Sequence, residues 1–123
     1  MKEKKGHTGE FAIRRALRKY VRKKLFLVPS SVSGTLGREL GLDSKALHNY
    51  LMRAKGCDAA QWRTGLRVEW AKQLLIADPG ALLSEIAARS GFSDRSNFSR
   101  QFLAHTGLTP AKWREQKKTI AES

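Results

Sequence analysis

The spacing of apolar residues along the chain predicts short helices joined by tight turns, most clearly over residues 82–114. Apolar residues keep helical spacing up to Gly91, and Phe98, Phe102 and Leu103 take up the same spacing further on. The short connection that begins at Gly91 leaves room only for a tight turn between two crossing helices. The pattern therefore predicts a helix-turn-helix in this part of the chain.

Two small residues fit the geometry of this turn. Gly91 can adopt a positive φ without a steric penalty, as a turn that redirects the chain this tightly requires. Ala87 lies four residues earlier and is small enough to let the second helix cross close to the first. Beyond the turn, the two phenylalanines share one face, and the other faces carry hydrogen-bond donors: Arg95, Ser96, Ser99 and Arg100. A helix with such a face suits the major groove of DNA.

The same pattern occurs twice, which indicates an internal duplication. The offset between the copies is 50 residues before the turn, as from Leu36 to Ile86, and 51 beyond it, as from Asp43 to Asp94. The other pairs are Leu40 with Ser90, Gly41 with Gly91, Leu42 with Phe92, Leu47 with Phe98, Leu51 with Phe102, Gly56 with Gly107, Trp62 with Trp113 and Arg63 with Arg114. Two copies of one helical unit predict two recognition helices.

The first copy is the less regular of the two. Gly34 and Gly37 fall at or within its short leading helix, where an interior glycine costs roughly 1 kcal/mol relative to alanine. Ser33 stands where the second copy has an apolar leucine, and Asn49 stands where it has Arg100. These differences leave open how firmly the first unit grips DNA and which bases it prefers.

Residues 11–25 predict a helix with one apolar stripe and a strongly basic opposite face. Pro29 and the serines after it end this helix, and the stripe consists of Ile13, Leu17, Tyr20, Val21 and Leu25. The basic face suits DNA phosphates or an anionic membrane surface. A merely solvated face is the third alternative, and the phosphate interpretation fits the rest of the chain best.

Residues 59–77 predict a long helix between the two copies. Asp58, followed three residues later by Gln61, is a capping-box variant at its start, and Asp78-Pro79-Gly80 ends it. At 1.5 Å per residue this helix spans roughly 28 Å. It would therefore hold two recognition helices near one DNA turn apart, about 34 Å.

The two ends of the chain differ in character. Thr109 followed by Pro110 is the favoured order at a helix start and predicts a last helix, in which Trp113 is expected in the core rather than as a platform for a base. Residues 1–10 have no periodic apolar residue and predict a flexible basic tail. Residues 119–123 are expected to fray.

The charge of the chain points to an anionic partner. Lysine and arginine number 24 against 11 acidic residues, which gives a net charge of +13. Nucleic acid is the leading partner and an anionic membrane the second. The apolar runs are far too short to span a membrane, and the single Cys57 excludes an internal disulfide and fits a reducing cytosol. We therefore expect a cytoplasmic, nucleoid-associated protein.

No arrangement of reactive residues predicts an enzyme. His7, His48 and His105 lack metal-ligand spacing, and the chain has neither a phosphate-cradling glycine loop nor a nucleophile in a recognisable setting. We expect no catalytic activity, no metal and no cofactor.

The chain resembles the arabinose-regulator (AraC/XylS) family. The matching residues are Glu85-Ile86-Ala87, Gly91-Phe92, Phe98-Ser99-Arg100, Phe102, Gly107, Thr109-Pro110 and Trp113-Arg114 in the second copy, with residues 67–72 and Leu74-Leu75 in the linker helix. The resemblance implies an all-α fold of about seven helices, in which a long linker helix joins two helix-turn-helix subdomains. It also implies a bacterial transcription regulator, similar to members without an effector domain, that binds double-stranded DNA as a monomer. It allows a contact with RNA polymerase.

These observations divide the chain into predicted segments. They are a tail over 1–10, a DNA-binding domain over 11–118 and a frayed end over 119–123, the domain holding a first helix-turn-helix over 34–56, a linker helix over 59–77 and a second helix-turn-helix over 82–107.

The candidate DNA contacts occupy positions that resemble those the family uses. The base-reading candidates are Lys45, His48 and Asn49 in the first unit, and Arg95, Ser96, Asn97, Ser99 and Arg100 in the second. Arginine and lysine pair with guanine and asparagine with adenine, whereas the serines are better suited to phosphate. Contacts to the DNA backbone are predicted from Arg53, Lys55, Lys112 and Arg114.

Two other functions fit the charge. One is a nonspecific basic protein that coats DNA, which would show no base-sequence preference. The other is a membrane-surface or partner-binding protein that uses the basic helix over 11–24, which predicts vesicle binding that survives loss of the second helix-turn-helix. The second alternative leaves the duplication unexplained.

Overall fold

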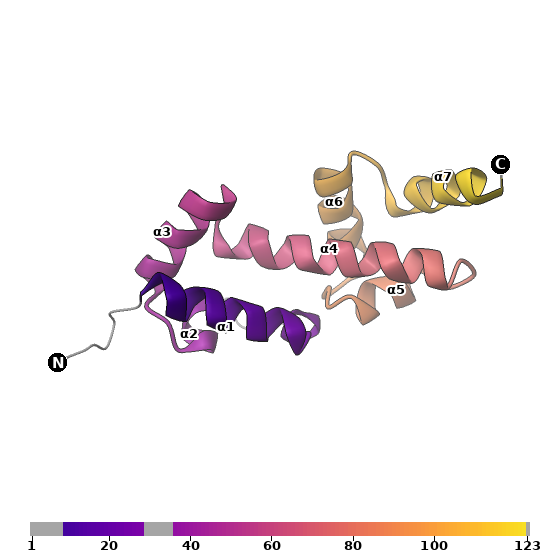
Figure 1. Cartoon of the computed structure of the whole chain (residues 1–123). Coiled ribbons are helices and arrows are strands. Elements are labelled where there is room, and N and C mark those ends of the chain that lie inside the picture. The colour runs from indigo at the N-terminus through magenta and orange to yellow at the C-terminus, as the bar shows by residue number, and fades with distance from the viewer. Residues whose placement is uncertain (1–8, 29–35, 123) are drawn as a thin grey trace. The chain divides into compact units, whose positions relative to one another are not determined.

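The computed structural model describes residues 9–28 and 36–122, whose regular structure is entirely helical (Figure 1). The elements are α1 (Glu10–Arg22), the 3-10 turn η1 (Leu25–Leu27), α2 (Leu36–Leu40), α3 (Ser44–Lys55), α4 (Ala59–Ala77), α5 (Leu83–Arg89), α6 (Arg95–Thr106) and α7 (Pro110–Glu122). Over the described residues, the structure confirms the predicted all-α fold with seven α-helices. The chain divides after Arg63 into two compact units, and α4 continues across that division.

Some predictions fall outside the described residues. They are most of the tail and the departures of the first copy at Ser33 and Gly34. The segment boundaries and the fraying of residues 119–123 stay predictions, although α7 itself extends to Glu122.

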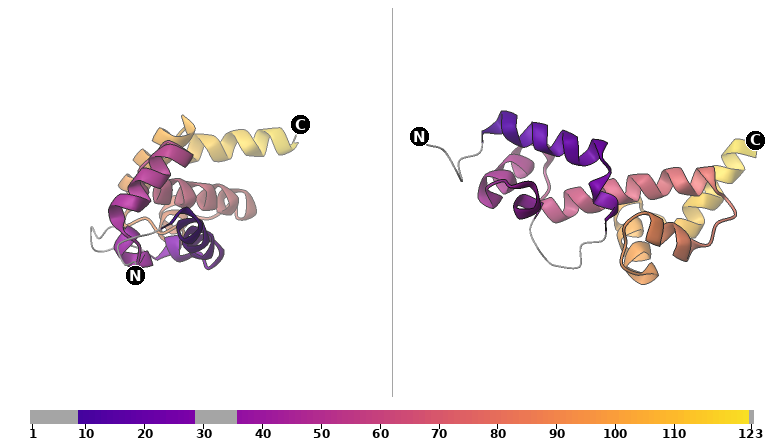
Figure 2. Two further views of the ribbon diagram at one scale, coloured as in Figure 1. Left: turned by 60° about the vertical axis from the view of Figure 1, so that its left-hand side comes forward. Right: turned by 90° about the horizontal axis from the view of Figure 1, so that it is seen from below.

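In the first unit, α1 packs against α3 and η1 (Figure 2). Ile13, Leu17 and Tyr20 form its buried stripe, as the apolar spacing predicts. The Tyr20 ring lies with its centroid 5.7 Å from that of Trp62 and 6.5 Å from that of Phe26. Aromatic contacts therefore join α1 to η1 and to the first turn of α4.

The helix α1 ends at Arg22, earlier than the apolar pattern suggested. Lys24 adopts the left-handed conformation with φ 55°, and η1 then directs Phe26 into the core. The predicted stripe was consequently wrong at two positions, because Val21 is 38% exposed and Leu25 41% exposed. Val21 lies at the edge of the stripe, and Leu25 comes after the chain has left helical geometry.

In the second unit, the core collects side chains from all four helices. Val68, Ala71 and Leu75 of α4 pack with Ile86 and Ala87 of α5 and with aromatic rings that follow them in the chain. Neighbouring ring centroids lie 5.1 Å apart for Phe92 and Phe98, 5.6 Å for Phe98 and Phe102, and 5.9 Å for Phe102 and Trp113. Trp113 is thus a core residue, as predicted.

Two short connections between helices follow the capping chemistry predicted from the sequence. At the start of α4, the Asp58 amide donates to Gln61 Oε1 at 2.9 Å, and the Gln61 amide donates to Asp58 Oδ1 at 2.8 Å. At the start of α7, the Lys112 amide donates to Thr109 Oγ1 at 3.2 Å. Both predicted caps are confirmed.

Gly37 has a packing role that helix propensity alone does not suggest. It is buried in α2, and a Cβ at this position would lie 2.8 Å from Ser44 Oγ and 3.0 Å from Ser44 Cα. Its partner in the repeat is Ala87, whose small side chain lies in the core of the second unit. Close approach of α2 and α3 therefore requires the glycine.

We predict that Gly37→Ala lowers the free energy of unfolding by about 1–2 kcal/mol, because the clash outweighs the better helix propensity of alanine. Gly65→Ala is the matched control, since its Cβ would be 3.7 Å from the nearest atom, His105 Cε1, in ordinary contact. That control should raise stability by up to about 1 kcal/mol. Urea denaturation followed by circular dichroism measures both, and a stabilised Gly37→Ala variant would contradict the packing argument.

Candidate nucleic-acid interface

The helices α3 and α6 begin and end in the same way. The Asp43 carboxylate accepts from the Ala46 amide at 2.9 Å, and the Asp94 carboxylate accepts from the Asn97 amide at 2.7 Å. Each helix stops at a glycine in the left-handed conformation, Gly56 or Gly107. The repeat in the sequence is thus a repeat of local structure.

The turn before each of these helices also follows one design. Gly41 precedes α3 with φ 71°, and Gly91 precedes α6 with φ 88°. Residues other than glycine rarely adopt such a φ. The prediction of a positive φ at Gly91 is confirmed, and its repeat partner has the same conformation.

A buried stripe fixes which face of each helix is exposed. Leu47, Tyr50 and Leu51 are buried in α3, and Phe98 and Phe102 are buried in α6. Because side chains on a helix recur every 3.6 residues, the positions between these residues must point away from the core. Each helix therefore presents its polar residues to solvent.

The base-reading candidates of α3 all lie on its exposed face. Lys45, His48 and Asn49 are exposed, and they follow one another at helical spacing. Together they offer a charged donor, an imidazole and an amide. The turn, the cap and the buried stripe bring these three residues together on one surface.

The candidates of α6 divide into two groups. Arg95, Ser96 and Arg100 are exposed, whereas Asn97 and Ser99 are half-buried. Asn97 Oδ1 accepts from Arg100 Nη2 and from Gln101 Nε2, each at 3.4 Å. Asn97 thus lies at the edge of the exposed face, where it helps to orient the Arg100 side chain.

The backbone-contact candidates have different surroundings. Lys55 and Lys112 are exposed. Arg53 is also exposed, but its Nη2 lies 3.2 Å from Glu10 Oε1 of α1. Its guanidinium carbon lies 5.8 Å from the centroid of the Tyr50 ring. Arg53 is therefore held beside α1 rather than left to extend freely.

Arg114 and its repeat partner Arg63 brace the helices within their own units. Arg114 Nη1 donates to the carbonyl oxygen of Ala81 at 2.7 Å, just before α5. Arg63 has a side chain only 10% exposed, and its Nη1 lies 3.2 Å from Glu39 Oε2 in α2. Sequence reasoning paired these two arginines by their offset but missed this bracing role.

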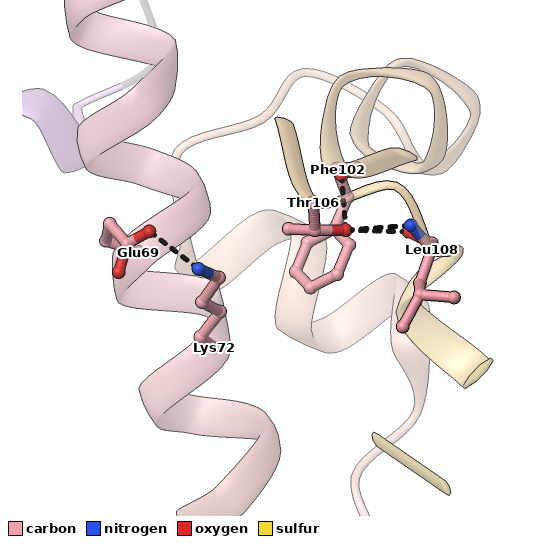
Figure 3. A network of polar contacts seen from close by, with 5 residues as sticks. All are labelled: Glu69, Lys72, Phe102, Thr106 and Leu108. Carbon is pink, nitrogen blue, oxygen red and sulfur yellow. Dashed lines mark hydrogen bonds and ion pairs between the residues drawn. The ribbon is translucent and has the colours of Figure 1, made fainter. Parts of the chain in front are cut away.

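The end of α6 is fixed by Thr106, whose contacts Figure 3 shows. Thr106 Oγ1 lies 2.8 Å from the Phe102 carbonyl oxygen and accepts from the Leu108 amide at 3.1 Å. Figure 3 also shows the pair formed by Lys72 and Glu69 on α4, whose Nζ and Oε2 atoms lie 2.8 Å apart. The contacts of Thr106 hold the last turn of α6 against the chain that leads to α7.

Sequence reasoning also missed the surface placement of Met52 and Leu103. Leu103 follows Phe102 and was grouped with the apolar residues of its helix, yet it is 47% exposed, and Met52 on α3 is 46% exposed. The two residues are repeat partners, since they lie 51 positions apart, which is the offset of the repeat beyond the turn. The pairing of positions was the signal that could have identified them.

A second basic surface lies on α1, away from its buried stripe. Its exposed basic residues are Arg14, Arg15, Arg18, Lys19 and Arg22, followed by Lys23 and Lys24. Glu10 is the acidic residue of this helix and pairs with Arg14 at 3.7 Å. The basic face predicted from the sequence is therefore present in the fold.

The remaining chemistry of the described residues is sparse. Among residues 9–28 and 36–122 there is no cluster of three or more side chains able to hold a metal ion. Within the same ranges, the helices are too short or too polar to cross a membrane.

Comparison with known proteins identifies the family to which this architecture belongs. The model of a family described as "Helix-turn-helix domain" matches residues 36–116. The transcriptional activator RhaR of Cronobacter sakazakii is 38% identical over 77 residues, which are 63% of this chain and 27% of that protein. The chain spans well under half the length of the curated relatives it matches.

Solved structures show the same fold. The C-terminal domain of AraT, a response regulator from Geobacillus stearothermophilus, has a TM-score of 0.71 and 26% identity, with 85% of this chain and 84% of that chain covered. The DNA-binding domain of the global transcriptional factor AdpA, solved in complex with a target DNA, has a TM-score of 0.72 and 19% identity, with 88% and 94% covered. At that identity the second likeness concerns the fold alone.

The fold and the paired exposed faces define a protein with two helix-turn-helix units. The chain belongs to the helix-turn-helix DNA-binding domains of the arabinose-regulator (AraC) type. The resemblance predicted from the sequence is thereby confirmed, and membership of a regulator family agrees with the expectation that the chain is not an enzyme.

We predict that Asp94→Ala lowers the free energy of unfolding by about 1 kcal/mol, because the Asn97 amide loses its capping acceptor. Asp94→Asn keeps a side-chain oxygen at the same position and should cost far less. Urea denaturation of the two variants, followed by circular dichroism, measures the difference. Equal losses for both variants would show that the negative charge, rather than the cap, stabilises α6.

Proposed function

We propose that this chain is a sequence-specific transcription regulator that places α3 and α6 in successive major grooves of double-stranded DNA. The observation that carries the proposal is the repeated design of these two helices. Each follows a glycine turn, begins at a capping aspartate, buries one stripe and presents polar side chains on the opposite face. Such a helix fits the width and the hydrogen-bonding pattern of the major groove.

The two faces carry different chemistry, which supports an asymmetric site. α3 presents Lys45, His48 and Asn49, whereas α6 presents mainly serine and arginine. In this proposal Asn49 pairs with adenine and Arg100 with guanine, since these are the bidentate partners of the two side chains. One chain would then read both halves of its site as a monomer.

The length of α4 is compatible with two grooves. The helix has 19 residues, which at 1.5 Å per residue is about 28 Å. Successive major grooves on one face of DNA repeat at about 34 Å. A helix of this length is therefore compatible with a chain that reaches two successive grooves.

The net charge of +13 supplies the nonspecific part of the affinity. Lysine and arginine side chains that meet phosphates release counterions, so the affinity falls as salt rises. We propose that Arg53, Lys55 and Lys112 contact the DNA backbone. Arg114 belongs to the same proposal, although one of its nitrogens is engaged with Ala81.

The functions of similar proteins support a role in transcription. RhaR is a transcriptional activator, and the DNA-binding domain of AdpA was solved with a target DNA. A regulator of this kind would act where the chromosome is, in the cytoplasm, and a contact with RNA polymerase would fit activation. The nonspecific coating and membrane-surface alternatives make different predictions. The first requires equal affinity for all duplexes, and the second requires binding to anionic vesicles.

We predict that Arg100→Ala weakens binding to the preferred duplex by roughly 5- to 150-fold, the equivalent of about 1–3 kcal/mol, because a bidentate contact to guanine is lost. Binding to random duplex should change little. Lys118→Ala, which removes an exposed charge from α7, is the matched control. Fluorescence anisotropy with both duplexes gives the two affinities, and equal losses on both would contradict a base-reading role.

We predict that Arg53→Gln weakens binding to specific and random duplexes alike, because a phosphate contact carries no sequence information. The slope of log affinity against log salt should decrease by about 0.9. Arg53→Lys keeps the charge and should retain most of the slope. A loss confined to the preferred duplex would place Arg53 at a base instead.

A further inference from the structure

We propose that Met52 and Leu103 are specificity-determining residues that read the methyl groups of thymine in the two halves of the site. The inference rests on the proposed function, because it requires that α3 and α6 enter major grooves. It adds an apolar contact to two helix faces whose other proposed base contacts are polar.

The first observation is the placement of these two side chains. Met52 lies three residues after Asn49 on α3, and Leu103 lies three residues after Arg100 on α6. Side chains three apart are neighbours on one helix face. Both apolar residues therefore extend the exposed face that carries the base-reading candidates.

The second observation is that packing explains neither of them. Met52 is 46% exposed and Leu103 is 47% exposed, and neither belongs to the buried core of its unit. They are the exposed large hydrophobic residues of α3 and α6. A single exposed leucine needs no explanation, but the same position in both copies of a repeat does.

The third observation is how the two exposed faces differ elsewhere. Lys45 pairs with Ser96, and His48 pairs with Ser99, so these positions carry different chemistry in the two units. Position 52 and its partner 103 are the point at which both faces are apolar. A shared property at one position, amid divergence at the others, indicates a contact common to both half-sites.

The major groove offers one apolar group on the base edges, which is the C5-methyl group of thymine. Three residues along a helix correspond to a rise of about 4.5 Å, close to the spacing of about 3.4 Å between successive bases. The methyl group read by Leu103 should thus lie within one or two base pairs of the base read by Arg100. The methyl group read by Met52 should likewise lie within one or two base pairs of the base read by Asn49.

The test begins with duplexes selected for binding from a random pool. In the selected duplex, each thymine is replaced in turn by deoxyuridine, which lacks the methyl group and keeps the same hydrogen-bonding edge. We expect about a fourfold loss of affinity at one or two thymines in each half-site, the equivalent of about 0.8 kcal/mol per methyl group. Fluorescence anisotropy measures each loss.

The variants assign each methyl group to a side chain. Leu103→Ala should bind the thymine duplex more weakly and no longer distinguish thymine from deoxyuridine in one half-site, and Met52→Ala should do the same in the other. Ile120→Ala, which truncates an exposed apolar residue on α7, is the control and should retain both discriminations. Because all three side chains are exposed, circular dichroism should report intact folds.

Two results would overturn the proposal in distinguishable ways. In the first, the selected duplex is preferred over random DNA, but no thymine is sensitive to loss of its methyl group, or no sensitive thymine lies near the guanine that Arg100 is proposed to read. The apolar contact is then absent and the proposed function stands. If the protein binds selected and random duplexes equally, the proposed function fails and this inference fails with it.

Discussion

The burial of one stripe on each recognition helix is the constraint on which the rest of the structure depends. Leu47 and Leu51 in α3, and Phe98 and Phe102 in α6, are almost inaccessible to solvent. Once these residues are buried, helical geometry leaves no choice for the face that carries Asn49 or Arg100. The helix face on which the polar side chains lie is therefore set by hydrophobic packing.

The two units meet this constraint with different residues. In the second unit, a series of aromatic rings from Phe92 to Trp113 fills the core, whereas the first unit combines aliphatic residues with Tyr20, Phe26 and Tyr50. Where the second unit has Ala87 in its core, the first has Gly37, at which a Cβ would lie 2.8 Å from Ser44 Oγ. The apparent weakness of the first copy in the sequence is in this respect an adaptation to packing.

Local patterns and repeat offsets predicted the helices, the turn at Gly91 and the caps at Asp58 and Thr109, because these features depend on residues close together in the chain. The end of α1 was harder to predict, because it depends on the left-handed conformation of Lys24. Such a conformation is usually indicated by a glycine, and no glycine lies near Lys24 in the sequence. The exposure of Leu103 was missed because it adjoins Phe102 in a pattern that fits either a core or a surface position. The contact of Arg114 with Ala81 joins residues distant in sequence, so no local pattern could indicate it.

In the proposed complex, both exposed helix faces, rather than the basic surface of α1, meet the DNA. A titration of the 15N-labelled chain with a preferred duplex, followed by NMR, tests it most directly. We expect the largest amide shift changes on α3 around residues 45–52 and on α6 around residues 96–103, with smaller changes elsewhere. Changes concentrated along residues 14–24, with α3 and α6 unaffected, would contradict it.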